Sequence, residues 1–427
     1  MSTDGFRKIC VMGLGYIGLP TAAMFASRKL NVVGVDVNPS VVDTVNQGKV
    51  HIVEPDLDMI VNATVSQGYL RAALHPEAAD AFLITVPTPF TGENHEPDLS
   101  YVEAATNAVA KVLQTGNLVV LESTSPVGTT EKMAESLAAR RPDLSFPNQR
   151  GAASDIRIAH CPERVLPGRI LHELVANDRV IGGMTQRCSA EAAQLYKSFV
   201  KGDCVIASKP GLAEMCKLVE NSFRDVNIAF ANELSLICSR LGLDVWELIQ
   251  LANRHPRVNI LQPGPGVGGH CIAVDPWFIV SSAPDEARLI KTARNVNDFK
   301  PEWTLGRVRA AIARHLMENP AQTARDVAVA LYGLAFKADI DDLRESPALA
   351  IARSIAREHP GPVLVVEPNI TQLPAGLERA SHTRLAEAAR ADVHVMLTDH
   401  TPFRNMTVPG GEKVDTRGVW KKRPLHQ

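Results

Sequence analysis

A glycine-rich segment that ends in a cysteine is the stretch of this sequence best suited to chemistry. Residues 264–271 read Gly-Pro-Gly-Val-Gly-Gly-His-Cys. Glycine adopts backbone angles that other residues avoid, and it lets another molecule approach the main chain closely. Cys271 is therefore a candidate nucleophile, because a thiolate attacks carbonyl carbons to form covalent intermediates. On this segment alone, a turn followed by a buried structural cysteine is an equally good interpretation.

Two further candidates lie on a predicted long helix. Between Pro210 and Gly242 apolar residues recur every three or four positions, which predicts about 30 residues of helix, about 45 Å long and able to bridge two domains. Lys217 and Asn221 share one face of this helix because they are four residues apart. Together they can hold a water or the oxygen of a reacting centre. A solvated helix face is the alternative interpretation for any lysine.

Polar side chains also follow several predicted strands. Thr88 comes after the strand at 81–86, Ser123 and Thr124 end the strand at 118–124, and Glu163 follows a proline after the segment at 156–161. Ligands of an open parallel sheet bind outside the carboxyl ends of its strands. The hydroxyl residues are therefore predicted to line a nicotinamide, and Glu163 is a candidate for a cleft. Turn formation and a solvated surface carboxylate are the respective alternatives.

The N-terminal segment has the fingerprint of a dinucleotide-binding βαβ unit. A strand at 8–13 leads into Gly13, Gly15 and Gly18, then a helix at 19–28 and a strand that ends in Asp36. The glycines permit a tight turn and close approach of a pyrophosphate to the helix N-terminus. Asp36 would accept hydrogen bonds from the ribose hydroxyls and repel a 2′-phosphate, so the predicted cofactor is NAD.

A second α/β half begins near residue 326 and lacks this fingerprint. Its strands are predicted at 326–336, 362–368 and 393–398, with Ser346 as the N-cap of a helix. Lys337 and Arg344, close to the end of its first strand, suit a phosphate or pyrophosphate. Helices are predicted at 289–299 and 303–317, interrupted at Pro301.

The predicted fold class is α/β, with two Rossmann-like doubly wound domains joined by a helical central domain that contains the long bridging helix. The predicted boundaries are 1–205, 206–300 and 301–427.

Composition excludes several other classes of protein. The 427 residues have a formal net charge of −2, which gives no reason to expect nucleic acid or a membrane surface as a partner. No apolar run is long enough to span a bilayer, and the polar N-terminus does not resemble a signal peptide. The seven cysteines are scattered without a CxxC motif, so neither a metal site nor a disulfide framework is predicted. These features predict a cytoplasmic protein.

The chain resembles the UDP-glucose/GDP-mannose dehydrogenase family over almost its whole length. The motifs that carry the resemblance are, in order, GLGYIGLP, VDVN, VPTP, ESTSPVGTT, CPERVLPG, AEMCKLVENSFRDVNIAFANE, NRHPRVN, GPGVGGHC, GLAFKADIDDLRESP and VDTRGVW. The resemblance implies oxidation of a sugar C6 alcohol to a carboxylate, with two NAD+ and one water consumed. It makes Cys271 the nucleophile, which would form a thiohemiacetal and then a thioester.

The resemblance also implies roles for other residues. Lys217 and Asn221 would stabilise the C6 oxyanion, and Asp275 would act with Lys217 through a water. Glu163 would be the general base of thioester hydrolysis, and Thr124 would bind water. The implied cofactor-binding residues are Gly13, Gly15, Tyr16, Ile17, Gly18, Asp36, Thr88, Thr124 and Arg344, the last at the pyrophosphate. The implied substrate-binding residues are Glu163, Arg164, Val165, Lys217, Asn221, Arg257, Gly268 and Lys337.

The substrate is implied less narrowly than the reaction. The stretches at 51–57, 253–280 and 341–348 are similar to those of family members that oxidise UDP-N-acetyl-D-mannosamine, with UDP-N-acetylglucosamine or UDP-glucose as alternatives. Val274 and Arg164 stand where many UDP-glucose enzymes have a lysine and an aromatic residue, which favours an N-acetylated sugar. The long helix and the family both predict a homodimer. A two-electron β-hydroxyacid dehydrogenase and an NAD-responsive binding protein are the rival hypotheses.

Overall fold

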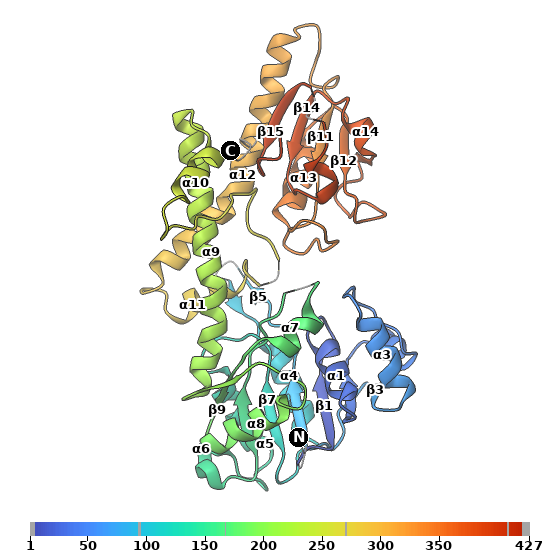
Figure 1. Cartoon of the computed structure of the whole chain (residues 1–427), viewed down its shortest axis with the longest axis vertical. Helices are drawn as coiled ribbons and strands as arrows, with labels where there is room; N and C mark the ends of the chain where they lie inside the picture. Colours follow the sequence, from blue (N-terminus) through green and yellow to red (C-terminus); the bar gives the residue numbers. More distant parts are fainter. Residues whose placement is uncertain (1–4, 93–94, 167, 270, 408–409, 421–427) are drawn as a thin grey trace. The chain divides into compact units, whose positions relative to one another are not determined.

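The computed structural model describes residues 5–92, 95–166, 168–269, 271–407 and 410–420. The chain divides into two compact units, each with its own β-sheet (Figure 1). The first unit comprises Met1–Glu220 and Trp277–Ser282, and the second comprises Asn221–Pro276 and Ala283–Gln427. Among the described residues, no helix is both long enough and apolar enough to cross a membrane.

The first unit is built on an eight-stranded sheet with the order β10-β9-β8-β7-β4-β1-β2-β3. The strands are β1 (Lys8–Met12), β2 (Asn31–Val35), β3 (Leu70–Ala73), β4 (Ala81–Ile84), β7 (Leu118–Leu121), β8 (Arg157–His160), β9 (Arg179–Gly183) and β10 (Cys204–Ala207). Strands β1 to β8 of this sheet run parallel, but β9 pairs antiparallel with β8, and β10 follows the direction of β9. The sheet is therefore doubly wound, with two reversed strands, β9 and β10, at one side. As a result, β9 begins at the edge where β8 ends.

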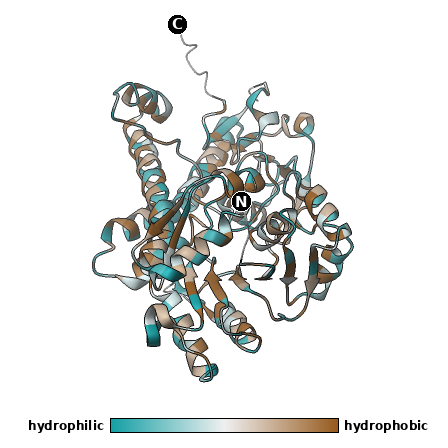
Figure 2. Ribbon diagram, turned by 60° about the horizontal axis from the view of Figure 1, so that its bottom comes forward, coloured by the Kyte–Doolittle hydropathy of each residue, from teal (hydrophilic) through white to brown (hydrophobic). Residues whose placement is uncertain are grey.

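Helices cover both faces of this sheet, as the alternation of β1 requires. Ile9 and Val11 lie in one apolar core and Cys10 and Met12 in the other, because successive side chains of a strand point to opposite faces. The strands are mostly brown in Figure 2, as expected for a sheet buried on both sides. The helices of this unit are α1 (Gly18–Ser27), α2 (Pro39–Asn46), α3 (Leu57–Ser66), α4 (Ser100–Ala110), α5 (Thr129–Arg140), α6 (Pro147–Arg150), α7 (Ile170–Ala176) and α8 (Gln186–Tyr196). A short hairpin joins β5 (Phe90–Thr91) to β6 (Glu96–Pro97).

The second unit contains a five-stranded parallel sheet with the order β13-β12-β11-β14-β15. Its strands are β11 (Val329–Tyr332), β12 (Val363–Val366), β13 (Ala380–His382), β14 (Val393–Met396) and β15 (Glu412–Asp415). Helix α13 (Pro347–Glu358) starts at the predicted N-cap, where the Ser346 side chain accepts a hydrogen bond from the Leu349 amide. The short helices α14 (Leu385–Ala388) and α15 (Thr401–Arg404) complete this part. The predicted fold class, with two Rossmann-like sheets, is confirmed.

Long helices connect these elements. The predicted long helix is α9 (Pro210–Leu241), followed by α10 (Val245–Ala252) and α11 (Asp275–Ser282). Helix α12 (Arg288–Glu318) packs on α13, β14 and β15 within the second unit (Figure 1).

The predicted interruption at Pro301 is wrong, because α12 continues through it as a single helix. Proline removes one backbone hydrogen bond and crowds the preceding turn. Buried side chains on both sides of it, Ala293 and Asn297 before and Thr304 and Val308 after, retain the helix by packing.

Candidate active site

The nucleotide loop of the first unit has the geometry that its glycine spacing predicts. Gly13 has a φ of +93°, and a Cβ there would lie 3.0 Å from the Thr85 carbonyl oxygen. A Cβ on Gly18 would lie 1.8 Å from the Gly13 carbonyl oxygen, whereas one on Gly15 would meet nothing within 4 Å. Close packing therefore requires the first and third glycines. The second leaves the main chain open to a pyrophosphate before α1.

Asp36 follows β2 and is half-buried. One carboxylate oxygen accepts a hydrogen bond from the Leu14 amide at 3.0 Å, and the other accepts one from the Asn38 amide at 2.9 Å. The carboxylate is thus fixed beside the glycine loop, where it can accept hydrogen bonds from ribose hydroxyls. Tyr16 and Ile17, between the glycines, are also half-buried. These residues fit a dinucleotide without a 2′-phosphate.

Replacing Asp36 by asparagine is expected to raise the KM for NAD+ about tenfold and to narrow the preference over NADP+. The amide keeps an oxygen for the Leu14 amide but loses the charge that repels a 2′-phosphate. Steady-state kinetics with both cofactors measures the effect. The matched control is Asp43→Asn on the exposed side of α2, which should leave both KM values as they were. An unchanged KM for NAD+ in Asp36→Asn would remove this carboxylate from the cofactor site.

The predicted hydroxyl residues lie together after β4 and β7. The Thr88 hydroxyl donates to the Thr124 carbonyl at 2.6 Å, and both residues are half-buried. Ser123 is buried and its hydroxyl donates to the Val86 carbonyl at 2.7 Å. Ser123 therefore links the two strand ends, in line with turn formation.

Glu163 is buried beside an arginine and a second glutamate that the sequence analysis missed. One of its carboxylate oxygens accepts from Arg179 Nη1 at 2.5 Å, and the other accepts from the Arg164 amide at 2.6 Å. Glu122, just after β7, lies 3.5 Å from the same Nη1. Burial raises the pKa of Glu122 to about 8. The available sequence signal was a charged residue next to an apolar strand, with Glu122 just after β7 and Arg179 at the start of β9.

Arg164 pairs with the N-terminal part of α9. Its Nη2 lies 2.6 Å from Glu220 Oε1, and its Nε donates to Glu220 Oε2 at 3.1 Å. Lys217, three residues before Glu220, is buried, and Val165 is half-buried. A planar, two-bond ion pair fixes the direction of the Arg164 guanidinium. Arg164, Glu163 and the helix that carries Lys217 are therefore joined within the first unit.

In the second unit, the cysteine loop is joined to the predicted Asn–Asp pair. Cys271 is half-buried, and its carbonyl accepts from the Asp275 amide at 2.8 Å at the start of α11. The Asp275 carboxylate accepts a hydrogen bond from the Asn221 side-chain amide, and both residues are buried. His270 lies outside the described residues.

The glycines of this loop are needed for close packing. A Cβ on Gly268 would lie 2.5 Å from the Glu345 carbonyl oxygen and 2.8 Å from Phe336 Cβ. Gly269 has a φ of +83°, and its amide donates to the Arg344 carbonyl at 3.2 Å. The loop therefore rests directly on the backbone that precedes α13.

A buried polar network, also missed by the sequence analysis, holds the start of the loop. The Gly264 amide donates to Asn232 Oδ1 at 2.9 Å, and Asn232 Nδ2 donates to Asn297 Oδ1 at 2.8 Å. Asn297 Nδ2 and Arg294 Nη1 donate to the Asp225 carboxylate at 2.8 and 2.7 Å. These bonds join α9, α12 and the loop. The sequence did not predict them, because nothing near each residue in the sequence indicates its distant partner.

The turn after β11 resembles the turn after β1, but different side chains pack beside it. The Gly333 amide donates to the Val366 carbonyl, as the Gly13 amide does to the Val35 carbonyl. Glu367, at the end of β12, accepts from the Leu334 amide at 2.7 Å and from His400 Nε2 at 2.9 Å. Unlike Asp36, Glu367 is fully buried.

The remaining predicted residues lie on the surface of the second unit. Lys337 and Arg344 are exposed in the segment between β11 and α13, and Arg344 forms an ion pair with Asp342 at 2.6 Å. Arg257 is exposed after α10. The Arg344 carbonyl thus contacts the loop that carries Cys271, through the Gly269 amide, whereas the Arg344 guanidinium pairs with Asp342.

Comparison with known families matches three consecutive segments of the chain. Residues 7–200 match the NAD binding domain of the UDP-glucose/GDP-mannose dehydrogenase family, residues 212–299 its central domain, and residues 330–422 its UDP binding domain. The chain belongs to this family. Its cofactor is NAD, in agreement with the open Gly15 and the fixed Asp36.

Relatives match over nearly the full length. A UDP-N-acetyl-D-mannosamine dehydrogenase of Yersinia pestis is 62% identical, covering 97% of this chain and all of the relative. An NDP-N-acetyl-D-galactosaminuronic acid dehydrogenase of Ralstonia nicotianae is 60% identical, covering 98% of each chain. Among solved structures, a UDP-D-ManNAc dehydrogenase from Pyrococcus horikoshii has a TM-score of 0.85 and 39% identity, covering 98% of this chain and 97% of the other.

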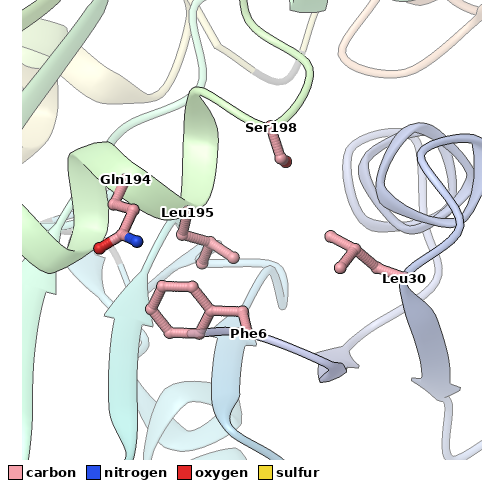
Figure 3. A pocket seen from close by; sticks show the side chains of 5 residues that line it. All are labelled: Phe6, Leu30, Gln194, Leu195 and Ser198. Atoms are coloured by element: carbon pink, nitrogen blue, oxygen red, sulfur yellow. The ribbon is translucent and has the colours of Figure 1, made fainter. Parts of the chain in front are cut away.

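A small hollow on the first unit lies apart from the predicted residues. It is lined by residues just before β1 and β2 and in or just after α8 (Figure 3), namely Phe6, Leu30, Gln194, Leu195 and Ser198. Its lining has no charged group, so it offers nothing for a nucleotide phosphate.

Proposed function

We propose that this protein oxidises C6 of UDP-N-acetyl-D-mannosamine to the carboxylate, with two NAD+ reduced and one water consumed per sugar. The observation that carries the proposal is the set of hydrogen bonds around Cys271. The Cys271 carbonyl accepts from the Asp275 amide, and the Asp275 carboxylate accepts from the Asn221 side chain. A thiol with this support suits an acyl-transfer step better than a simple alcohol oxidation. The full-length similarity to a UDP-N-acetyl-D-mannosamine dehydrogenase supports the choice of sugar.

The proposed sequence of steps oxidises C6 twice. The first oxidation removes a hydride from C6 and releases the proton of its hydroxyl to water, and the second removes a hydride from the thiohemiacetal. NAD+, when bound, would supply the hydride acceptor for both. The Cys271 sulfur adds to the C6 aldehyde to give a thiohemiacetal, and loss of hydride converts this to a thioester. Lys217 and Asn221 stabilise the negative oxygen, and Asp275 keeps the Asn221 amide oriented.

Hydrolysis of the thioester completes the reaction. Glu163 takes a proton from a water, the water oxygen bonds to C6, and the sulfur leaves as thiolate. Thr124 helps to place that water. Arg164, Val165, Arg257, Gly268 and Lys337 contact the substrate, and Arg344 contacts the cofactor. The domain boundaries at 205 and 300 remain a prediction, as do the cytoplasmic location and a role of the product in surface polysaccharide.

The test is to offer UDP-N-acetylmannosamine, UDP-N-acetylgalactosamine, UDP-N-acetylglucosamine and UDP-glucose with NAD+, and to count NADH against acid formed. Two NADH per acid, with the mannosamine derivative giving the highest kcat/KM, is the expected result. Preference for the galactosamine derivative would support the second candidate, which the relative from Ralstonia nicotianae favours. One NADH per sugar would overturn the thioester route and favour a two-electron dehydrogenase.

We also propose that the protein is a homodimer formed through α9. Three of its exposed apolar side chains are spaced by seven residues, which places them on one stripe with a drift of about 20° per heptad. A second copy of the same stripe, related by a two-fold axis, would cover it. The stripe comprises Phe223, Phe230, Ile237 and Leu241, which are 69%, 51%, 47% and 63% exposed.

A charge in this stripe is expected to separate the subunits. Phe230→Asp should convert a dimer into a monomer in light scattering at micromolar concentration, because an unpaired carboxylate cannot be buried in an apolar contact. Leu289→Asp, at an apolar position at the start of α12 that is 68% exposed, is the control and should leave the mass unchanged. A monomeric wild type, or a Phe230→Asp variant that stays dimeric, would reject the α9 interface.

A further inference from the structure

Three charged side chains converge at one edge of the first sheet. Glu122 follows β7, Glu163 lies three residues after β8, and Arg179 is the first residue of the reversed strand β9. All three are more than nine-tenths buried. The reversal of β9 explains the convergence, because it places the start of that strand beside the ends of the other two.

One nitrogen of Arg179 is shared between the two carboxylates. Nη1 lies 2.5 Å from Glu163 Oε2 and 3.5 Å from Glu122 Oε1, so the stronger hydrogen bond goes to Glu163. Two buried carboxylates with one guanidinium would leave an uncompensated negative charge if both were ionised. The pair therefore competes for a single positive charge.

Two aromatic rings also lie close to the guanidinium. The Arg179 Cζ atom lies 5.1 Å from the centre of the Tyr196 ring and 5.9 Å from that of Phe199, and both rings are buried. Cation–π contact and burial leave the guanidinium little room to leave the site. What can change is how Nη1 divides its hydrogen bonding between Glu163 and Glu122.

Glu122 is the group of this cluster that titrates near neutral pH. Burial raises its pKa to about 8, against the opposing effect of Arg179. Burial lowers the pKa of Arg179, but Glu163 and its other neighbours raise it more, so it stays charged. The other titratable neighbours are neutral at pH 7: burial raises the pKa of Cys161 and of Tyr196, and it lowers the pKa of His160 to about 3.

We propose that Arg179 is a positioning residue that orients Glu163, and that Glu122 competes for the same guanidinium nitrogen whenever it has lost its proton. The proposal rests on the proposed function, in which Glu163 is the base of thioester hydrolysis. With Glu122 protonated, Nη1 is committed to Glu163, and the Arg164 amide holds the other oxygen. When Glu122 releases its proton to solvent, Nη1 is drawn toward it and the hold on Glu163 weakens. Hydrolysis then slows at alkaline pH.

The first experiment compares the wild type with Glu122→Gln. Steady-state rate and the fraction of enzyme held as thioester, read by acid quench and intact-protein mass, are followed from about pH 6 to about pH 9.5. In the wild type, kcat should fall and the thioester fraction should rise above the Glu122 pKa of about 8. Glu122→Gln should abolish both changes, because glutamine keeps the shape and cannot ionise. The same alkaline fall in Glu122→Gln, or none in the wild type, would overturn the proposal.

The second experiment tests the orientation itself. Arg179→Lys keeps the charge but cannot hold a carboxylate in a fixed plane. It should lower kcat about tenfold, leave KM within a factor of about two and accumulate thioester. Arg157→Met is the matched control, since Arg157 is a buried arginine of β8 paired with Glu191 at 3.1 Å. It should lose stability without accumulating thioester. An Arg179→Lys variant that behaves like this control would contradict a positioning role.

A third variant separates this inference from the proposed function. Glu163→Gln should accumulate thioester whatever Arg179 and Glu122 do. If Glu163→Gln traps no thioester, the proposed function fails. If it does, but Arg179→Lys accumulates no thioester and Glu122→Gln retains the wild-type pH profile, the inference alone fails.

Discussion

Replacement of Cys271 by serine is expected to lower the steady-state rate of NADH formation by at least about a thousandfold, the scale on which loss of an enzyme nucleophile acts. A serine hydroxyl is almost wholly protonated at neutral pH and is a far weaker nucleophile than a thiolate. The side chain is half-buried and nearly isosteric with serine, so the melting temperature should stay within about 2 °C of the wild type. Stopped-time assays and thermal unfolding measure the two quantities.

The control for this variant is Cys204→Ser, because Cys204 is also half-buried but lies on the edge strand β10. It should retain activity within a factor of about two. Intact-protein mass should detect a thioester in Glu163→Gln that disappears when Cys271→Ser is added. More than a tenth of the wild-type rate in the serine variant would exclude a covalent step on this sulfur.

Gly268→Ala is expected to lower kcat/KM about a hundredfold, the scale on which a displacement of about 1 Å acts. A Cβ at this position would lie 2.5 Å from the Glu345 carbonyl oxygen and 2.8 Å from both Phe336 Cβ and Pro347 Cδ. None of these atoms is the end of a flexible side chain, so the loop that carries Cys271 must move. Steady-state kinetics with circular dichroism to confirm folding measures the effect.

Gly306→Ala is the matched control, because a Cβ at this position on α12 meets no atom within 4 Å. In a helix interior the alanine should stabilise the protein by about 0.5–1 kcal/mol and leave kcat/KM unchanged. If Gly268→Ala folds normally with full activity, the loop does not need its close contact with the segment before α13.

Local signals predicted the nucleotide loop and the long helix well. Gly13, Gly15, Gly18 and Asp36 follow from the spacing of one βαβ unit, which lies within about 30 consecutive residues. The long amphipathic stretch likewise predicted α9 to within a residue, because burial on one face dominates over that length.

The errors and omissions come from contacts that are distant in sequence. Pro301 is an unfavourable helix residue, and only packing of its flanking residues overcomes that cost. The reversal of β9 depends on which strand it pairs with, which no local pattern states. Arg179 and Glu122 are 57 residues apart, so each alone is only a charge beside an apolar strand. The same holds for the bond between Asn232 and Asn297.

The buried Glu367 has a consequence for redesign of the second sheet. Asp36, the corresponding acid of the first unit, is half-buried. Glu367, by contrast, already accepts hydrogen bonds from the Leu334 and Ala335 amides and from His400. Grafting a GxGxxG turn after β11 would therefore not create a second dinucleotide site. An engineer would first have to remove His400 and lengthen the turn, and both changes would sacrifice contacts that hold this half of the molecule together.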